Sequence, residues 1–220
     1  MKGSMPAKDF VRTVTTLALA LTAASCVLVH PRQPKPNPDQ GDWAEARDAA
    51  MRGAQLYDGI DHRANAVAVH LTTRVREARA ARLADWYAWS PAELDARLAQ
   101  ERAEAAASEE FVVAFYTADL RANDLDAKES IWRVALVVDG INSLPTKVEG
   151  LTMDWTVKQL YPVFGPFDLV YRVRFPKIEG GLEKRPYVLR LTSAMGGLDL
   201  DFAGPAKLPR GLDSVPPAAR

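Results

Sequence analysis

The spacing of apolar positions along the chain changes near residue 109. From Asp42 to Glu110 the chain is rich in alanine, contains one proline and repeats its apolar residues every three or four positions, which is typical of helices. From Phe111 onward the period is two, and β-branched and aromatic residues replace alanine. This pattern predicts an α+β fold with a helical region over 42–108 and an antiparallel β-sandwich over 109–203, immunoglobulin-like or jelly-roll in type.

Three helices are expected in the first region. The first runs from about Trp43 to Tyr57, and the second from about His62 to Trp86. The third has the strongest start signal, because the run Ser90-Pro91-Ala92-Glu93 places serine at the N-cap, proline at the first helical position and glutamate at the third. We therefore predict a capping box at Ser90 and a helix that continues to about residue 107.

Six or seven short strands are expected in the second region, with turn residues between them and no intervening helix. They cover residues 111–117, 131–139, 147–151, 155–161, 167–175, 187–193 and 198–202. Strands that follow one another so closely favour antiparallel pairing. The alternation predicts a core that includes Phe115, Trp132, Val134, Leu136, Leu169, Tyr171, Leu189 and Leu200.

The amino terminus has the features of a secretory signal. Basic residues within 2–12 precede the uncharged run VTTLALALTAA over 14–24, which is too short to cross ~30 Å of hydrocarbon as a helix. The small residues Ala23, Ala24 and Ser25 then lead into Cys26, the chain's one cysteine. This run resembles the lipobox of bacterial lipoproteins, although Ala23 stands where leucine is commonest in that class. The resemblance covers residues 1–26 alone.

The resemblance implies that residues 1–25 are a signal peptide and that Cys26 carries acyl chains such as palmitate, which would anchor the protein in a lipid bilayer of the cell envelope. Four prolines within 26–41 favour an extended tether after the cysteine, and the proline-rich residues 204–220 are expected to be a disordered tail. Val27 after the cysteine, in place of aspartate, favours the outer membrane over the inner in a Gram-negative cell.

Composition argues against several kinds of partner and site. Lys and Arg number 28, as do Asp and Glu, so no basic excess is available to neutralise phosphates and we expect no nucleic-acid partner. A single cysteine excludes an intramolecular disulfide framework and a cysteine-based zinc or iron–sulfur site. With three histidines in the chain, we expect no metal and no cofactor.

Two acidic groups are candidates for chemistry. Asn123 to Asp126, with Glu129 and Asp119 near, gather oxygen ligands that suit calcium, but the EF-hand spacing is absent and such residues also favour turns. Asp199 and Asp201 project from one face of a predicted strand. They could act as a carboxylate pair in acid–base chemistry, or they are simply the solvent-exposed side of that strand. No nucleophile–base motif is visible.

An aromatic cluster of Trp86, Tyr87 and Trp89 precedes the third helix. Such residues serve either as a binding surface or as packing against the core. We therefore expect a membrane-tethered envelope lipoprotein with a non-enzymatic binding, assembly or structural role, whose partner is an envelope protein or polymer. The alternative is a lipid-anchored hydrolase that uses the surface carboxylates.

Overall fold

The computed structural model describes residues 41–183 and 185–204. The predicted signal peptide, Cys26, the tether and residues 205–220 of the predicted tail lie outside these residues. The elements, in chain order, are α2 (Gly41–Ala49), β1 (Met51–Asp58), β2 (Asp61–His70), α3 (Thr73–Tyr87), α4 (Pro91–Ala107), β3 (Ser108–Thr117), a 3-10 turn (Leu120–Ala122), β4 (Arg133–Val138), β5 (Ile141–Ser143), β6 (Lys147–Leu151), α5 (Trp155–Leu160), β7 (Leu169–Pro176), β8 (Tyr187–Ser193) and β9 (Gly196–Asp201).

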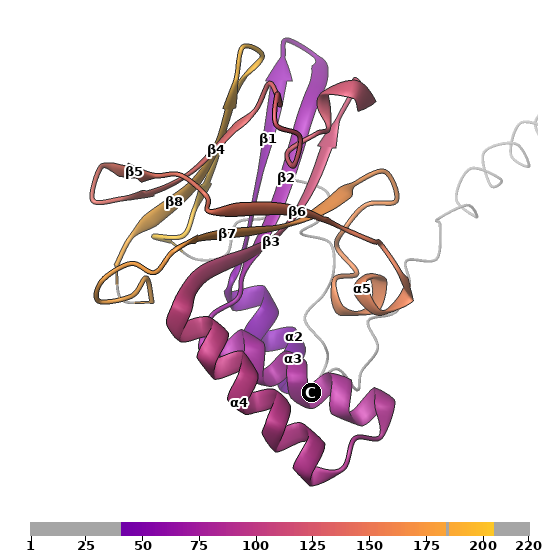
Figure 1. The fold of residues 1–220 in the computed structure, drawn as a ribbon. Helices are drawn as coiled ribbons and strands as arrows, with labels where there is room; N and C mark the ends of the chain where they lie inside the picture. Colours follow the sequence, from indigo (N-terminus) through magenta and orange to yellow (C-terminus); the bar gives the residue numbers. More distant parts are fainter. Residues whose placement is uncertain (1–40, 184, 205–220) are drawn as a thin grey trace, which may run out of the picture. The chain divides into compact units, whose positions relative to one another are not determined.

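The strands form two antiparallel sheets that face each other. One sheet has the order β1-β2-β3-β7-β6 and the other the order β5-β4-β8-β9 (Figure 1). Side chains from both sheets share one buried cluster, in which Phe115 of β3 and Tyr171 of β7 lie with Leu136 of β4 and Leu189 of β8. The predicted class, α+β with an antiparallel β-sandwich, is confirmed.

A helical layer covers the other face of the five-stranded sheet. Val67 of β2 and Val112 of β3 point away from the sandwich and pack with Trp43 of α2, Val75 of α3 and Leu160 of α5. Helices α2, α3 and α4 lie side by side at one end of the strands (Figure 1). The central strands β2 and β3 are therefore buried on both faces.

The prediction of helix throughout 42–108 is wrong between residues 51 and 70. The chain forms the hairpin β1–β2 there, in a register that pairs Asp58 with Asp61 around a turn at Gly59, whose φ is 61°. Alanines 64, 66 and 68 suggested a helix, but in the structure all three are fully buried and face the opposite sheet. Their small side chains fill the space between two close layers, and this packing outweighs their helix propensity.

The third predicted helix is confirmed in detail. Ser90 Oγ accepts a hydrogen bond from the Glu93 amide at 3.3 Å, and the Glu93 carboxylate accepts one from the Ser90 amide at 2.7 Å. Pro91 occupies the first helical position. This reciprocal pairing satisfies amide groups that the first turn leaves free, which is why local sequence identified the helix start.

One strand prediction and one core prediction need correction. Residues 155–161 were expected to form a strand, but Trp155–Leu160 is the short helix α5, capped by Asp154 through the Val157 amide. Leu169 was expected in the core, yet it is 49% exposed at the start of β7. The other seven predicted core residues are all buried.

Candidate functional site

The connection between α3 and α4 presents two aromatic rings to solvent. Ala88 adopts a left-handed conformation with φ 50°, and its amide donates to the Ala84 carbonyl to close the end of α3. This tight cap projects Tyr87 and Trp89 from neighbouring positions, where their rings stack with centroids 6.3 Å apart. Tyr87 is 55% exposed and Trp89 is half-buried, so both rings have faces free for contact.

Helix α5 adds a third aromatic residue beside this turn. The hydroxyl groups of Tyr87 and Thr156 are hydrogen-bonded at 2.6 Å, which brings the start of α5 against the end of α3. Trp155, the residue before Thr156, is 77% exposed, and the Lys158 ammonium lies 5.2 Å from its ring centroid. We call Tyr87, Trp89 and Trp155 the aromatic surface.

The structure separates Trp86 from its two predicted companions. Trp86 is half-buried and packs against the cluster between the helices and the five-stranded sheet. The guanidinium of Arg82 lies 5.0 Å from its ring centroid. Of the predicted cluster, Tyr87 and Trp89 therefore belong to the surface and Trp86 to the packing, while Trp155 was missed because its segment was read as a strand.

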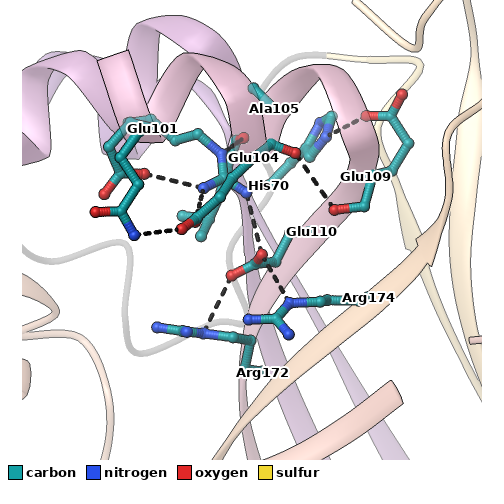
Figure 2. A network of polar contacts seen from close by, with 12 residues as sticks. His70, Glu101, Glu104, Ala105, Glu109, Glu110, Arg172 and Arg174 are labelled. Atoms are coloured by element: carbon teal, nitrogen blue, oxygen red, sulfur yellow. Dashed lines mark hydrogen bonds and ion pairs between the residues drawn. The ribbon is translucent and has the colours of Figure 1, made fainter. Parts of the chain in front are cut away.

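A buried network of ion pairs joins the helices to the sheet (Figure 2). Glu101 of α4 accepts hydrogen bonds from Arg76 at 2.9 Å and from Arg79 at 2.9 and 3.0 Å, both on α3. The Glu101 side chain is 1% exposed, and Arg97 forms an ion pair with it at 2.7 Å. Burial alone would raise the pKa of Glu101, but the charges and hydrogen bonds of Arg79 and Arg76 outweigh it and hold that pKa below its ordinary value.

The same network continues into β3 and β7. Arg76, itself 1% exposed, also donates to Glu110 of β3 at 3.1 Å. Glu110 in turn pairs with Arg172 at 3.1 Å and Arg174 at 3.2 Å, both on β7 (Figure 2). Every charge named here has an opposite partner within reach, so the arrangement orients the helices on the sheet and leaves no free acid or base.

A second buried group centres on His70 at the end of β2. Its Nδ1 lies 2.7 Å from the Tyr187 hydroxyl and its Nε2 lies 3.3 Å from Glu109 Oε2. Lys177 pairs with the other Glu109 oxygen at 2.8 Å. Burial would raise the pKa of Glu109, but hydrogen bonds from His70 and Lys177 outweigh it and lower that pKa, while burial raises the pKa of Tyr187.

This carboxylate–imidazole–phenol chain lies beside a cavity of about 290 Å³, lined in part by His70, Glu109 and Lys177. These residues are far apart in the sequence, and no motif there links them. His70 shares a strand face with Ala66 and Ala68, and the alternation of β2 would have indicated that placement had the segment been read as a strand.

The acidic loop around Asn123 to Asp126, which the sequence left open as a turn or a calcium site, makes structural hydrogen bonds. Asn123 is buried, donates to the Phe115 carbonyl at 2.7 Å and accepts from the Tyr171 hydroxyl at 3.0 Å. Asp124 accepts from Ser130 at 2.8 Å. Within residues 41–183 and 185–204 no three acidic, histidine or cysteine side chains are grouped so that they could hold a metal ion.

The carboxylate pair on β9 is also held by its neighbours. Asp199 makes a two-pronged ion pair with Arg190 on β8, at 2.7 Å for both contacts. Asp201 accepts from the Ala203 amide at 2.7 Å. Glu129 and Asp126 are exposed, and Asp119 pairs with Arg121 at 2.9 Å. These five carboxylates line neither of the cavities of about 290 and 600 Å³.

Comparisons with models of protein families, with curated proteins and with solved structures return no match to this chain. Among the helices of the described residues, none is long and apolar enough to cross a membrane.

Proposed function

We propose that the protein is a cell-envelope lipoprotein, tethered to a membrane through acylated Cys26, whose body binds another envelope component. The observation that carries the binding role is the aromatic surface, because Trp155 and Tyr87 are 77% and 55% exposed and the hydroxyl of Tyr87 bonds to Thr156, the residue after Trp155. Exposed Trp and Tyr rings offer large contact areas at a low entropic cost, which suits stacking on a polymer or anchoring a protein partner.

The tether is proposed from the lipobox-like run that ends at Cys26. One acyl chain gives marginal membrane binding and two or more give stable anchoring, at about 0.8 kcal/mol per buried CH₂ group. We expect Cys26→Ser to abolish incorporation of radiolabelled fatty acid and to leave the protein either as an uncleaved precursor or in the soluble fraction. A wild-type protein without label, or a labelled Cys26→Ser variant, would refute the tether.

The binding role is tested with matched tyrosines. Tyr57 lies on the β1–β2 hairpin and is 53% exposed, close to the 55% of Tyr87, so it controls for the loss of an exposed ring elsewhere on the body. We expect Tyr87→Ala and Trp155→Ala to reduce co-sedimentation with purified peptidoglycan or capture of a cross-linked envelope protein, and Tyr57→Ala to leave both unchanged. Equal effects of Tyr57→Ala and Tyr87→Ala would contradict a specific role for the aromatic surface.

A lipid-anchored hydrolase is the second candidate. The observation that favours it is the position of His70 and Glu109 together on the cavity of about 290 Å³, rather than the surface carboxylates. In this reading His70 is the base and Glu109 orients it. Turnover of ester or amide substrates by the purified protein, lost in His70→Gln, would support the hydrolase over the binding protein.

A further inference from the structure

Arg82 of α3 is a buried cation for which residues 41–183 and 185–204 supply no anionic partner. Arg82 is 9% exposed, and its Nε is buried without a hydrogen-bond partner in the described part of the chain. The guanidinium carbon lies 5.0 Å from the centroid of the Trp86 ring, which is a cation–π contact. A cation–π contact contributes far less than the loss of hydration that burial of a charge entails.

The other two buried arginines of α3, Arg76 and Arg79, both have carboxylate partners. Arg79, one turn before Arg82 on the same helix, donates twice to Glu101. Arg76 has three carboxylate partners, which are Glu101, Glu104 and Glu110. No carboxylate among the described residues plays that part for Arg82, so its guanidinium can donate charge-assisted hydrogen bonds to the anionic group of a ligand.

Arg82 lines a pocket of about 600 Å³ between α2, α3 and α4. Two further arginines on its wall are already paired, Arg74 with Glu45 at 2.8 Å and Arg102 with Glu77 at 2.7 Å. These pairs are exposed and bring no net charge, so the positive charge that the pocket itself supplies is that of Arg82.

The wall of the pocket also carries two acidic side chains, Asp42 and Asp85. Both are exposed and have no described ion-pair partner, and water can hydrate them. They would repel a doubly charged anion such as phosphate, and they would attract a cationic group that lies beside a bound carboxylate.

We propose that this pocket binds a zwitterionic amino-acid group, with its carboxylate on Arg82 and its ammonium toward Asp42 and Asp85. A planar carboxylate matches the two-pronged geometry of a guanidinium, and the Arg82 guanidinium also contacts the ring of Trp86. The ligand is a free amino acid or the end of a short peptide. This inference depends neither on the lipid at Cys26 nor on the aromatic surface.

The test measures binding of four probes to the full chain: L-alanine, L-alanyl-L-alanine, acetate and inorganic phosphate. Two-dimensional NMR follows the indole N–H of Trp86, assigned with Trp86→Phe, because that ring lies against Arg82. We expect alanine or its dipeptide to shift this resonance saturably, acetate to bind more weakly and phosphate not at all. Response to the dipeptide alone identifies a peptide end, and response to alanine identifies a free amino acid.

Two variants separate a ligand site from a structural role. Arg82→Met keeps the length of the side chain and removes the charge, so we expect affinity for the zwitterion to fall about tenfold or more and the midpoint of thermal unfolding to stay level or rise. Arg190→Met, which removes a partly exposed arginine of β8 that pairs with Asp199 and does not line the pocket, is the control and should keep the wild-type affinity. Arg82→Lys keeps the charge and should bind with an intermediate affinity.

Three results would overturn the proposal. The first is the absence of a saturable shift with any of the four probes. The second is phosphate binding as tightly as the amino acid, which would indicate a general anion site. The third is a thermal midpoint of Arg82→Met well below the wild type with unchanged affinity, which would assign Arg82 to packing alone.

Discussion

Removal of the charge of Glu101 is the sharpest test of the buried network that joins α3, α4 and the sheet. Glu101→Gln retains the size of the side chain but turns one acceptor oxygen into an N–H donor group that faces guanidinium donors. Arg76 would keep Glu104 and Glu110 as partners. Arg79, whose one described carboxylate partner is Glu101, would become a buried charge without an anion.

The size of the effect follows from that single uncompensated charge. Breaking a buried ion pair from one side costs about 3–5 kcal/mol, because the remaining charge stays out of water. For a domain of this size each kcal/mol moves the thermal midpoint by about 2–4 °C, so Glu101→Gln should lower it by roughly 6–20 °C. Urea unfolding monitored by circular dichroism gives the free energy of unfolding independently.

A matched control uses the same substitution at the surface of the same helix pair. Glu77 of α3 pairs with Arg102 of α4 at 2.7 Å, but their side chains are 38% and 59% exposed. Exposed pairs contribute about 0–1 kcal/mol, so Glu77→Gln should change stability little. If Glu101→Gln and Glu77→Gln destabilise the protein equally, Glu101 is not the anchor of the network and the reasoning is refuted.

Three further predictions follow from local geometry. Ser90→Ala should cost about 1 kcal/mol of unfolding free energy, measured in urea, and an unchanged value would contradict the capping box. Gly196→Ala should lower the midpoint of thermal unfolding further than the control Gly197→Ala. Gly196 has φ 130°, and an added Cβ there would lie 2.9 Å from the Leu56 side chain, whereas a Cβ at Gly197 would make ordinary contacts. Equal midpoints for the two variants would contradict this prediction. The pKa of Glu101 is lowered below 4.5 in the folded state, so the free energy of unfolding should be highest near neutral pH and should fall as the pH drops below about 4.5. The fall should be less steep in Glu101→Gln. Equal slopes in the two proteins would show that Glu101 does not contribute to the pH dependence of stability.

Much of the architecture was predictable where local signals and packing agree. The capping box at Ser90 is built from four consecutive residues, so α4 was found with its start. The strands β6 and β8 lie within the bounds that alternation and turn residues predicted. Local signals misled where packing on two sides decides the structure, as in the hairpin β1–β2, or where a cap operates through a single side chain, as Asp154 does for α5.

The sequence by itself determined the α+β class and the antiparallel pairing after residue 110, because periodicity and turn signals act over a few neighbouring residues. Whether Trp86, Tyr87 and Trp89 pack or face solvent was left open by the sequence and decided by the structure. The tertiary structure alone decided which charges are buried. Glu101 lies within the predicted third helix, and it became the centre of an ion-pair network only when α3 packed against that helix. The sequence does not distinguish Arg82 from the other arginines, and only the packing of the helices buries it without a carboxylate from the described residues. Dehydration of a charge depends on every layer that surrounds it, and those layers come from distant parts of the chain.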